Sequence, residues 1–291
     1  NQRQNMTENS ISLLLKNVTV NYRNGYKALW NASFEIPNST ITALVGVNGS
    51  GKSTLFKAIM GFLPISEGTI KIQGKNVSTA LKNNLISYVP QSEEVDWSFP
   101  VLVRDVVMMG RYGHMGFLRL AKKNDYIAVE NALSRVNMID YSHRQIGELY
   151  GGQRKRVFLA RSIAQESQII LLDEPFNGID VKTEDQIIKL LNEFRKEGRV
   201  MLVSTHNLGS VPEFCDRSVL IKGTILQYGL TEQVFTRENL ENAFGGVLRH
   251  FSLGGTDLHE DGDKREVSIL SDDERPFVQY GNVPLKTDKK K

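Results

Sequence analysis

The chain has 291 residues, of which 40% are hydrophobic and 24% are charged, and its formal net charge is +3. This is the composition of an ordinary globular protein, and no apolar run approaches the roughly 18 residues that a membrane-spanning helix needs. The single cysteine, Cys215, excludes an internal disulfide framework, and the first ten residues lack the apolar segment of a secretory signal.

The N-terminal part of the chain predicts strands, then a glycine loop and a helix. Residues 11–36 are expected to form strands with a loop around Tyr22, and the apolar run 40–45 predicts a buried strand. Residues 46–54 have the sequence Gly-Val-Asn-Gly-Ser-Gly-Lys-Ser-Thr, which matches the phosphate-loop pattern G-x-x-x-x-G-K-[ST]. A helix is expected over residues 54–60.

This order of elements favours a phosphate-binding site. The backbone N–H groups of the loop and the positive end of the helix dipole converge on one point, where a polyphosphate fits. Lys52 would reach the β- and γ-phosphates, and the Ser53 hydroxyl would bind Mg²⁺. A chance match in a glycine-rich turn is the alternative, and the flanking strand and helix argue against it.

The middle of the chain changes from strands to helices. Residues 68–72 and 85–89 predict short strands, and the amide of Gln91 would contact Mg²⁺ or an attacking water. Residues 101–148 have helical character. The segment 95–118 is rich in aromatic residues and methionines, which either pack a helical subdomain or line a groove for a partner's helix. These residues are Trp97, Phe99, Met108, Met109, Tyr112, Met115 and Phe117.

A second glycine segment, Leu149–Gln153, precedes a predicted helix over residues 154–164. Two glycines before a helix form another N-terminal anion cradle. One nucleotide does not need two cradles in one subunit, so this segment favours a head-to-tail pair of subunits in which it faces the partner's phosphates. An ordinary glycine turn is the alternative.

Charged and polar residues follow two apolar strands in the C-terminal half. The run 169–172 ends in Asp173 and Glu174, and the run 200–203 leads to His206. At the carboxyl edge of a parallel sheet, Asp173 would hold Mg²⁺, Glu174 would polarise a water, and His206 would bond the γ-phosphate. Each alone is also compatible with an ordinary loop residue. The alternation of strands and helices predicts an α/β fold with a parallel sheet.

The order of these motifs resembles the ATPase subunit of ATP-binding cassette (ABC) transporters over roughly residues 11–245. The resemblance implies a P-loop NTPase fold: a mostly parallel central sheet, an antiparallel β subdomain and an inserted helical subdomain at about 95–150. It also implies that ATP and Mg²⁺ are the cofactors. Residues 1–10 are expected to be a flexible segment, and residues 246–291 a polar, poorly packed tail.

The resemblance assigns roles to individual residues. Tyr22 stacks on adenine, Glu174 is the general base and His206 contacts the γ-phosphate. Asp180, by itself most simply a helix N-cap, communicates across the dimer. The expected catalytic residues are Glu174, His206, Lys52 and Gln91. The expected nucleotide-binding residues are Tyr22, Gly46, Asn48, Gly49, Ser50, Gly51, Lys52, Ser53, Thr54, Gln91 and Asp173. The expected Mg²⁺ ligands are Ser53, Gln91 and Asp173. The expected contacts to the partner's ATP are Leu149, Tyr150, Gly151, Gly152 and Gln153.

A narrower likeness concerns the transported substrate. Segments 89–100, 106–115 and 173–180 are similar to the ATPases of bacterial manganese, zinc and iron importers. This implies a homodimer at the cytoplasmic face of the plasma membrane that hydrolyses ATP to energise uptake of manganese or iron. Its partners would be integral permease subunits and, indirectly, an extracytoplasmic metal-binding protein, but no nucleic acid. The five histidines have no zinc-ligand spacing.

Tyr150 departs from the family pattern, which has serine there. Tyrosine is not a favoured N-cap, and its bulk would crowd a phosphate, so a weaker ATP sandwich is expected. Two alternatives remain. One is an ABC ATPase that acts on ribosomes or DNA, although such proteins usually carry two cassettes or a long coiled coil. The other is a nucleotide-binding regulatory module with weak hydrolysis.

Overall fold

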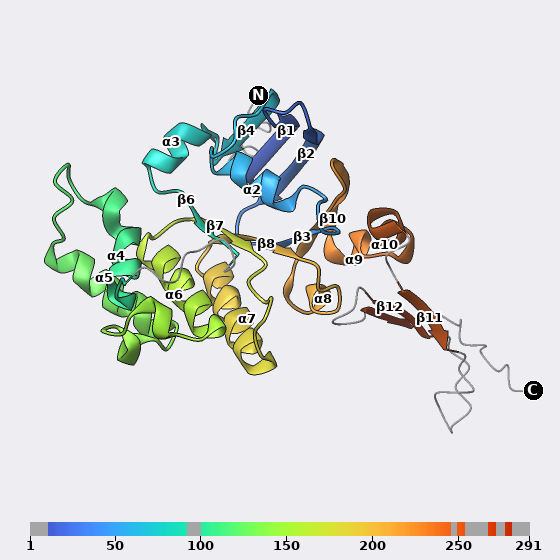
Figure 1. The fold of residues 1–291 in the computed structure, drawn as a ribbon. Helices are drawn as coiled ribbons and strands as arrows, with labels where there is room; N and C mark the ends of the chain where they lie inside the picture. Colours follow the sequence, from blue (N-terminus) through green and yellow to red (C-terminus); the bar gives the residue numbers. More distant parts are fainter. Residues whose placement is uncertain (1–10, 92–99, 246–248, 254–266, 272–276, 281–291) are drawn as a thin grey trace, which may run out of the picture.

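The structure is a computed structural model that describes residues 11–91, 100–245, 249–253, 267–271 and 277–280 (Figure 1). Some expectations therefore lie outside the described residues. They are the flexible N-terminal segment, the packing of Trp97 and Phe99, and most of the C-terminal tail.

A six-stranded sheet forms the centre of the molecule, in the order β10-β9-β3-β8-β7-β6. Its strands are β3 (Ile41–Val45), β6 (Ile86–Val89), β7 (Ile169–Asp173), β8 (Val200–Thr205), β9 (Arg217–Ile221) and β10 (Ile225–Leu230). All neighbouring pairs from β6 to β9 are parallel, and β10 is antiparallel to β9. Every residue of β3, β7 and β8 is buried, as expected for parallel strands covered on both faces. The expected mostly parallel sheet is confirmed.

Two hydrophobic cores lie on the two faces of this sheet. In β7, Ile169 and Leu171 belong to one core and Ile170 and Leu172 to the other, because successive side chains of a strand alternate. The first core also contains α2 (Lys52–Ile59) and the inner face of an antiparallel sheet, β2-β1-β4-β5. That sheet consists of β1 (Ile11–Asn21), β2 (Lys27–Pro37), β4 (Glu67–Ile72) and β5 (Lys75–Asn76).

The second core contains the helices on the other face, where Figure 1 shows α6 and α7 beside the sheet and α4 and α5 further out. These helices are α4 (Val103–Met108), α5 (Lys123–Arg135), α6 (Gly151–Ala164) and α7 (Val181–Lys196). The remaining short helices are α3 (Val77–Lys82), η2 (Met109–His114), η3 (Ile139–Tyr141), η4 (Ile146–Glu148), α8 (Val211–Phe214), α9 (Thr231–Val234) and α10 (Arg237–Phe244). Among the described residues, no helix has both the length and the apolar character to cross a bilayer.

Two helices begin earlier than their sequences indicate. Helix α2 begins at Lys52 rather than residue 54, and α6 begins at Gly151 rather than residue 154. The first turn of a helix leaves its N–H groups without intrahelical partners, so residues of low helix propensity are tolerated there. Glycine at the start of α6 therefore belongs to the helix instead of preceding it.

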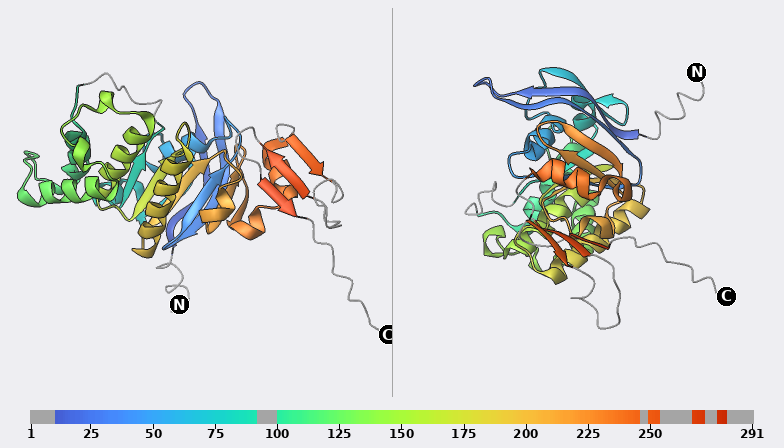
Figure 2. Two further views of the ribbon diagram at one scale, coloured as in Figure 1. Left: turned by 90° about the horizontal axis from the view of Figure 1, so that it is seen from below. Right: turned by 90° about the vertical axis from the view of Figure 1, so that its right-hand side faces the viewer.

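The segment expected to be a polar, poorly packed tail contains a three-stranded antiparallel sheet in the order β11-β12-β13. Its strands are β11 (Arg249–Leu253), β12 (Val267–Ser271) and β13 (Phe277–Tyr280). β-Branched and aromatic residues recur within these three short runs, and the polarity of the whole segment concealed them. Figure 2 shows this sheet at the end of the molecule opposite α4 and α5.

Candidate active site

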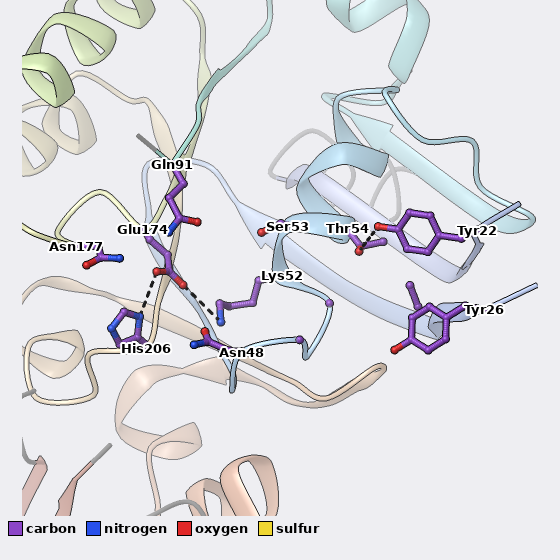
Figure 3. A pocket seen from close by; sticks show the side chains of 13 residues that line it. Tyr22, Tyr26, Asn48, Lys52, Ser53, Thr54, Gln91, Glu174, Asn177 and His206 are labelled. Carbon is purple, nitrogen blue, oxygen red and sulfur yellow. Dashed lines mark hydrogen bonds and ion pairs between the residues drawn. The ribbon is translucent and has the colours of Figure 1, made fainter. Parts of the chain in front are cut away.

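A cavity of about 660 Å³ lies at the carboxyl edge of the central sheet (Figure 3). Asn48 follows β3, Gln91 follows β6, Glu174 follows β7 and His206 follows β8, so parallel pairing brings four distant segments together. This edge is where ligands bind in open α/β sheets. The cavity is lined by Tyr22, Tyr26, Ala28, Asn48, Gly49, Gly51, Lys52, Ser53, Thr54, Gln91, Glu174, Asn177 and His206.

The loop between β3 and α2 is packed so closely that two of its positions require glycine. A Cβ atom on Gly46 would lie 2.3 Å from the carbonyl oxygen of Ile221 in β9. Gly51 has a φ of +104°, and a Cβ atom there would lie 2.7 Å from Leu29 Cδ2. The loop therefore approaches its neighbours through bare backbone, and the N-terminus of α2 faces the cavity as an anion cradle.

Lys52 is the first residue of α2 and is buried, with 6% of its surface exposed. Its Nζ donates hydrogen bonds to the carbonyl oxygens of Gly46, at 2.7 Å, and Val47, at 3.3 Å. It also lies 3.7 Å from Glu174 Oε1. A buried ammonium group is thus held at the cavity by carbonyl oxygens and one carboxylate, where it would meet an anionic ligand.

Glu174 lies between Lys52 and His206, and Figure 3 shows both contacts. His206 Nδ1 is 3.3 Å from Glu174 Oε2. The hydrogen bond from His206 is the main cause that holds the pKa of Glu174 below its ordinary value; Lys52 and Lys155 also lower it, whereas burial opposes the shift. The carboxylate therefore stays ionised at neutral pH, as an acceptor of protons must.

The backbone of Glu174 is unusual because its φ is +48°, a left-handed conformation that side-chain-bearing residues rarely adopt. Its N–H donates to Ser204 Oγ at 2.9 Å, and its carbonyl oxygen accepts from Lys155 Nζ at 3.2 Å. Lys155 also donates to the carbonyl oxygen of Asn177. Helix α6 and strand β8 thus hold this residue from both sides of its peptide backbone.

Asp173 is 3% exposed and does not line the cavity. Its Oδ1 accepts a hydrogen bond from Ser204 Oγ at 2.5 Å, and its Oδ2 accepts one from the Tyr88 hydroxyl at 3.1 Å. Ser53 and Gln91, in contrast, line the cavity directly. A hydroxyl, an amide oxygen and a carboxylate are the oxygen ligands that Mg²⁺ takes, so the types of residue gathered here fit that ion.

The structure gathers most of the expected nucleotide-binding residues but leaves two expected groups outside the cavity. Gly46, Ser50 and Asp173, which were expected to bind the nucleotide, do not line the cavity, and none of residues 149–153 lines it. Asp180 caps α7: its Oδ1 accepts from the Thr183 N–H at 3.0 Å and its Oδ2 from the Thr183 hydroxyl at 2.7 Å, and these bonds lower its pKa.

Tyr150 is the N-cap of α6, and its side chain makes no cap hydrogen bond. Its N–H donates to Gln153 Oε1 at 3.0 Å, and its side chain is 82% exposed. Tyr150 and Gly151 are therefore exposed at the start of α6, and the segment Leu149–Gln153 does not line the cavity of its own chain.

Five residues that sequence reasoning missed belong to this site: Tyr26, Ala28, Lys155, Asn177 and Ser204. Tyr26 carried a signal, since it is a second aromatic residue four positions after Tyr22. Ser204 also carried one, because it precedes His206 at a strand tip. Lys155 carried none, because a lysine inside a charged helix resembles a solvated side chain.

Residues 29–177 match the ABC transporter family. The chain is 58% identical to the chelated iron transport system membrane protein YfeB of Yersinia pestis, over 93% of this chain and 92% of that relative. It is 55% identical to the manganese transport system ATP-binding protein MntA of Synechocystis sp., over 83% of this chain and 93% of that relative.

Among solved structures, one match is a dimeric ATP-binding cassette in a post-hydrolysis state, bound to ADP and phosphate. The TM-score is 0.66 at 26% sequence identity, and the match covers 75% of this chain and 98% of the other.

Proposed function

This chain belongs to the ATP-binding subunits of ABC transporters, and on that premise we propose that it hydrolyses ATP to energise the import of manganese or iron. The observation that carries the proposal is the meeting of Lys52, Glu174 and His206 at one cavity beside the phosphate loop. The names of the two relatives supply the substrate class: one is a chelated iron system and the other a manganese system.

Binding of the triphosphate rests on the loop and on Lys52. Once it turns from the carbonyl oxygens of Gly46 and Val47, the Lys52 ammonium would pair with the β- and γ-phosphate oxygens. Ser53 and Gln91, with Asp173 behind them, would hold Mg²⁺, which when bound neutralises charge on those oxygens. At the opposite end of the cavity, the Tyr22 ring would stack on adenine.

Hydrolysis rests on positioning and electrostatics. The ionised Glu174 carboxylate would orient the attacking water and accept its proton. His206, 3.3 Å from that carboxylate, would fix its direction and bond the γ-phosphate. Gln91, on the same cavity wall, would contact the water or Mg²⁺. These roles need no covalent intermediate on the protein.

A second subunit would complete the site. The N-terminus of α6 faces outward beside the exposed Tyr150, so Leu149–Gln153 would contact the phosphates of the partner's ATP, and Asp180 would contact the partner. The dimeric cassette bound to ADP and phosphate supports this arrangement. Separation of the subunits after hydrolysis would then drive the transport system.

The described part of segment 95–118, from Met108 to Phe117, is the proposed docking surface for the permease subunits at the cytoplasmic face of the membrane. Met109, Tyr112 and Phe117 are exposed, whereas Met108 and Met115 are half-buried. The exposed side chains favour docking over packing for those positions. An extracytoplasmic metal-binding protein would deliver the metal to the permease. Within the described residues, no group of three or more His, Cys, Asp or Glu side chains forms a metal site.

The test is turnover of MgATP by the purified full-length chain and its Glu174→Gln variant. The variant should lose about 100-fold or more in turnover and still bind MgATP, because only the base is removed. Glu213→Gln, an exposed glutamate on α8, is the control and should be unaffected. Equal turnover of both variants would contradict the role of Glu174.

The metal is tested in cells. Replacement of the native chain by Glu174→Gln should abolish uptake of radioactive manganese or iron. Normal uptake of both ions would refute the transport role, and wild-type binding of ATP without turnover would support the regulatory alternative.

A further inference from the structure

A buried ammonium group lies behind the loop that carries Glu174. Lys155 belongs to the second turn of α6, and only 8% of its surface is exposed. Its Nζ donates to the carbonyl oxygen of Glu174 at 3.2 Å and to that of Asn177. Burial of a charged group lowers stability unless other groups compensate for the lost water, and lysine is almost never fully buried without a partner. A lysine in this place therefore points to a role at the site.

Two side chains of the cavity come from the short loop that Lys155 contacts. Glu174 and Asn177 both line the cavity, and Figure 3 shows them at the end where His206 lies. The Asn177 N–H donates to the carbonyl oxygen of Glu174 at 3.3 Å, so residues 174–177 form a closed turn. The Lys155 ammonium group bonds the carbonyl oxygens at both ends of this turn and thereby fixes it to α6.

The backbone of Glu174 needs such support because its φ of +48° is unfavourable for a residue with a side chain. This left-handed conformation costs about 1–3 kcal/mol and persists only where the surrounding structure enforces it. Ser204 Oγ accepts from the Glu174 N–H at 2.9 Å, and Lys155 donates to the carbonyl oxygen. A return to negative φ would redirect the Cα–Cβ bond and move the carboxylate from its place 3.3 Å from His206 Nδ1.

We propose that Lys155 is a positioning residue for ATP hydrolysis: its buried ammonium group holds the peptide of Glu174 in the conformation that directs the carboxylate into the cavity. The inference rests on the proposed function and adds a residue that does not itself touch the nucleotide. Displacement of a catalytic group by about 1 Å can lower the rate about 100-fold. Loss of Lys155 should therefore reduce turnover and leave nucleotide affinity unchanged, because the phosphate loop is not altered.

Turnover of MgATP and calorimetric binding of MgADP by the purified full-length chain test this role. Lys155→Met keeps a similar side-chain volume without donor or charge; its kcat should fall about 10–100-fold, with MgADP affinity within about twofold of the wild type. Lys155→Arg keeps the charge and the donors and should recover most of the lost turnover. Lys189→Met removes an exposed lysine of α7 that does not line the cavity, and it should have no effect.

A double-mutant cycle with Glu174→Gln separates positioning from general damage. Since Lys155 acts through the Glu174 carboxylate, Lys155→Met should cause little further loss in the Glu174→Gln background, measured by single-turnover hydrolysis. Equal losses in both backgrounds would overturn the proposal, and so would wild-type kcat of Lys155→Met.

If Lys155→Met does not fold, Lys155→Gln, which keeps a donor without the charge, replaces it in the cycle, and the same outcomes decide. Failure of the wild type to hydrolyse MgATP would instead refute the proposed function itself.

Discussion

The glycine segments before α2 and at the start of α6 are alike in sequence but differ in structure. At Gly46 a Cβ atom would collide with the Ile221 carbonyl oxygen at 2.3 Å, so the chain itself requires glycine. At Gly151 the nearest atom to a Cβ would be the Gly178 carbonyl oxygen at 4.0 Å, which leaves ordinary space. Gly46 is buried by its own chain, whereas Gly151 is exposed beside Tyr150.

A glycine can be required at a position either by packing within its own subunit or by contact with another molecule. Packing within one subunit explains the glycines at positions 46 and 51 of the phosphate loop. Nothing among the described residues explains glycine at 151, so any requirement for it must come from another molecule. The proposed dimer supplies one, since close approach of backbone to a phosphate also favours glycine.

The largest effect should come from alanine substitutions at Gly46 and Gly151, which test whether the two glycines differ as the structure indicates. Gly46→Ala should lower the free energy of unfolding by about 1–3 kcal/mol, because overpacking forces the loop from β9. Gly151→Ala should change it by no more than about 0.5 kcal/mol. Urea denaturation of both variants measures the difference.

The same pair should differ in assembly. Gly151→Ala is expected to fold normally but to reduce ATP-dependent dimerisation, measured by light scattering with the Glu174→Gln background to prevent hydrolysis. Normal dimerisation of Gly151→Ala would remove the argument that a partner's phosphate requires this glycine.

A smaller effect is expected at the exposed segment itself. Tyr150→Ser should raise ATPase turnover several-fold, because a serine N-cap stabilises a helix start by about 0.5–2 kcal/mol and removes the bulky ring. Tyr150→Ala removes the ring without adding the hydroxyl and so separates the two causes. Equal or lower turnover of Tyr150→Ser would show that the tyrosine is accommodated without loss.

The smallest expected effect is a shift in the pH dependence of ATP hydrolysis, and it concerns Glu174 and His206 in the cavity. The hydrogen bond from His206 is the main cause of the lowered pKa of Glu174, so His206→Ala should raise that pKa and move the acid limb of the ATPase profile to higher pH. The lowered pKa of Glu174 also makes the stability of the fold depend on pH. A depressed carboxyl pKa stabilises the fold above the unfolded-state pKa, and this stabilisation is lost as pH falls through the folded-state value.

The pH dependence of kcat measures this shift, and His143→Ala, an exposed histidine outside the cavity, is the control. An acid limb that stays in place in His206→Ala would indicate that Lys52 and Lys155 alone keep Glu174 ionised.

The local patterns of the sequence determined much of this protein. The phosphate loop, the buried strands β3, β7 and β8 and the carboxylates after β7 follow from motif spacing and from runs of apolar residues, which depend only on near neighbours in the chain. The starts of α2 and α6 were placed two or three residues too late, since the N–H groups of the first helical turn need no intrahelical partners and residue types there vary widely. The strands β11–β13 were missed because their short runs lie within a polar segment.

Tertiary structure alone decided how distant residues meet at the site. Asp173 pairs with Ser204 because β7 and β8 are parallel neighbours in that register, and no local pattern specifies which strands pair. Lys155 reaches the carbonyl oxygen of Glu174 only because α6 packs beneath the loop after β7. The rings of Tyr22 and Tyr26 lie 6.3 Å apart because backbone hydrogen bonds close the turn at residues 22–26. Residue types set which chemistry is available, and the register and packing of the sheet set which groups touch.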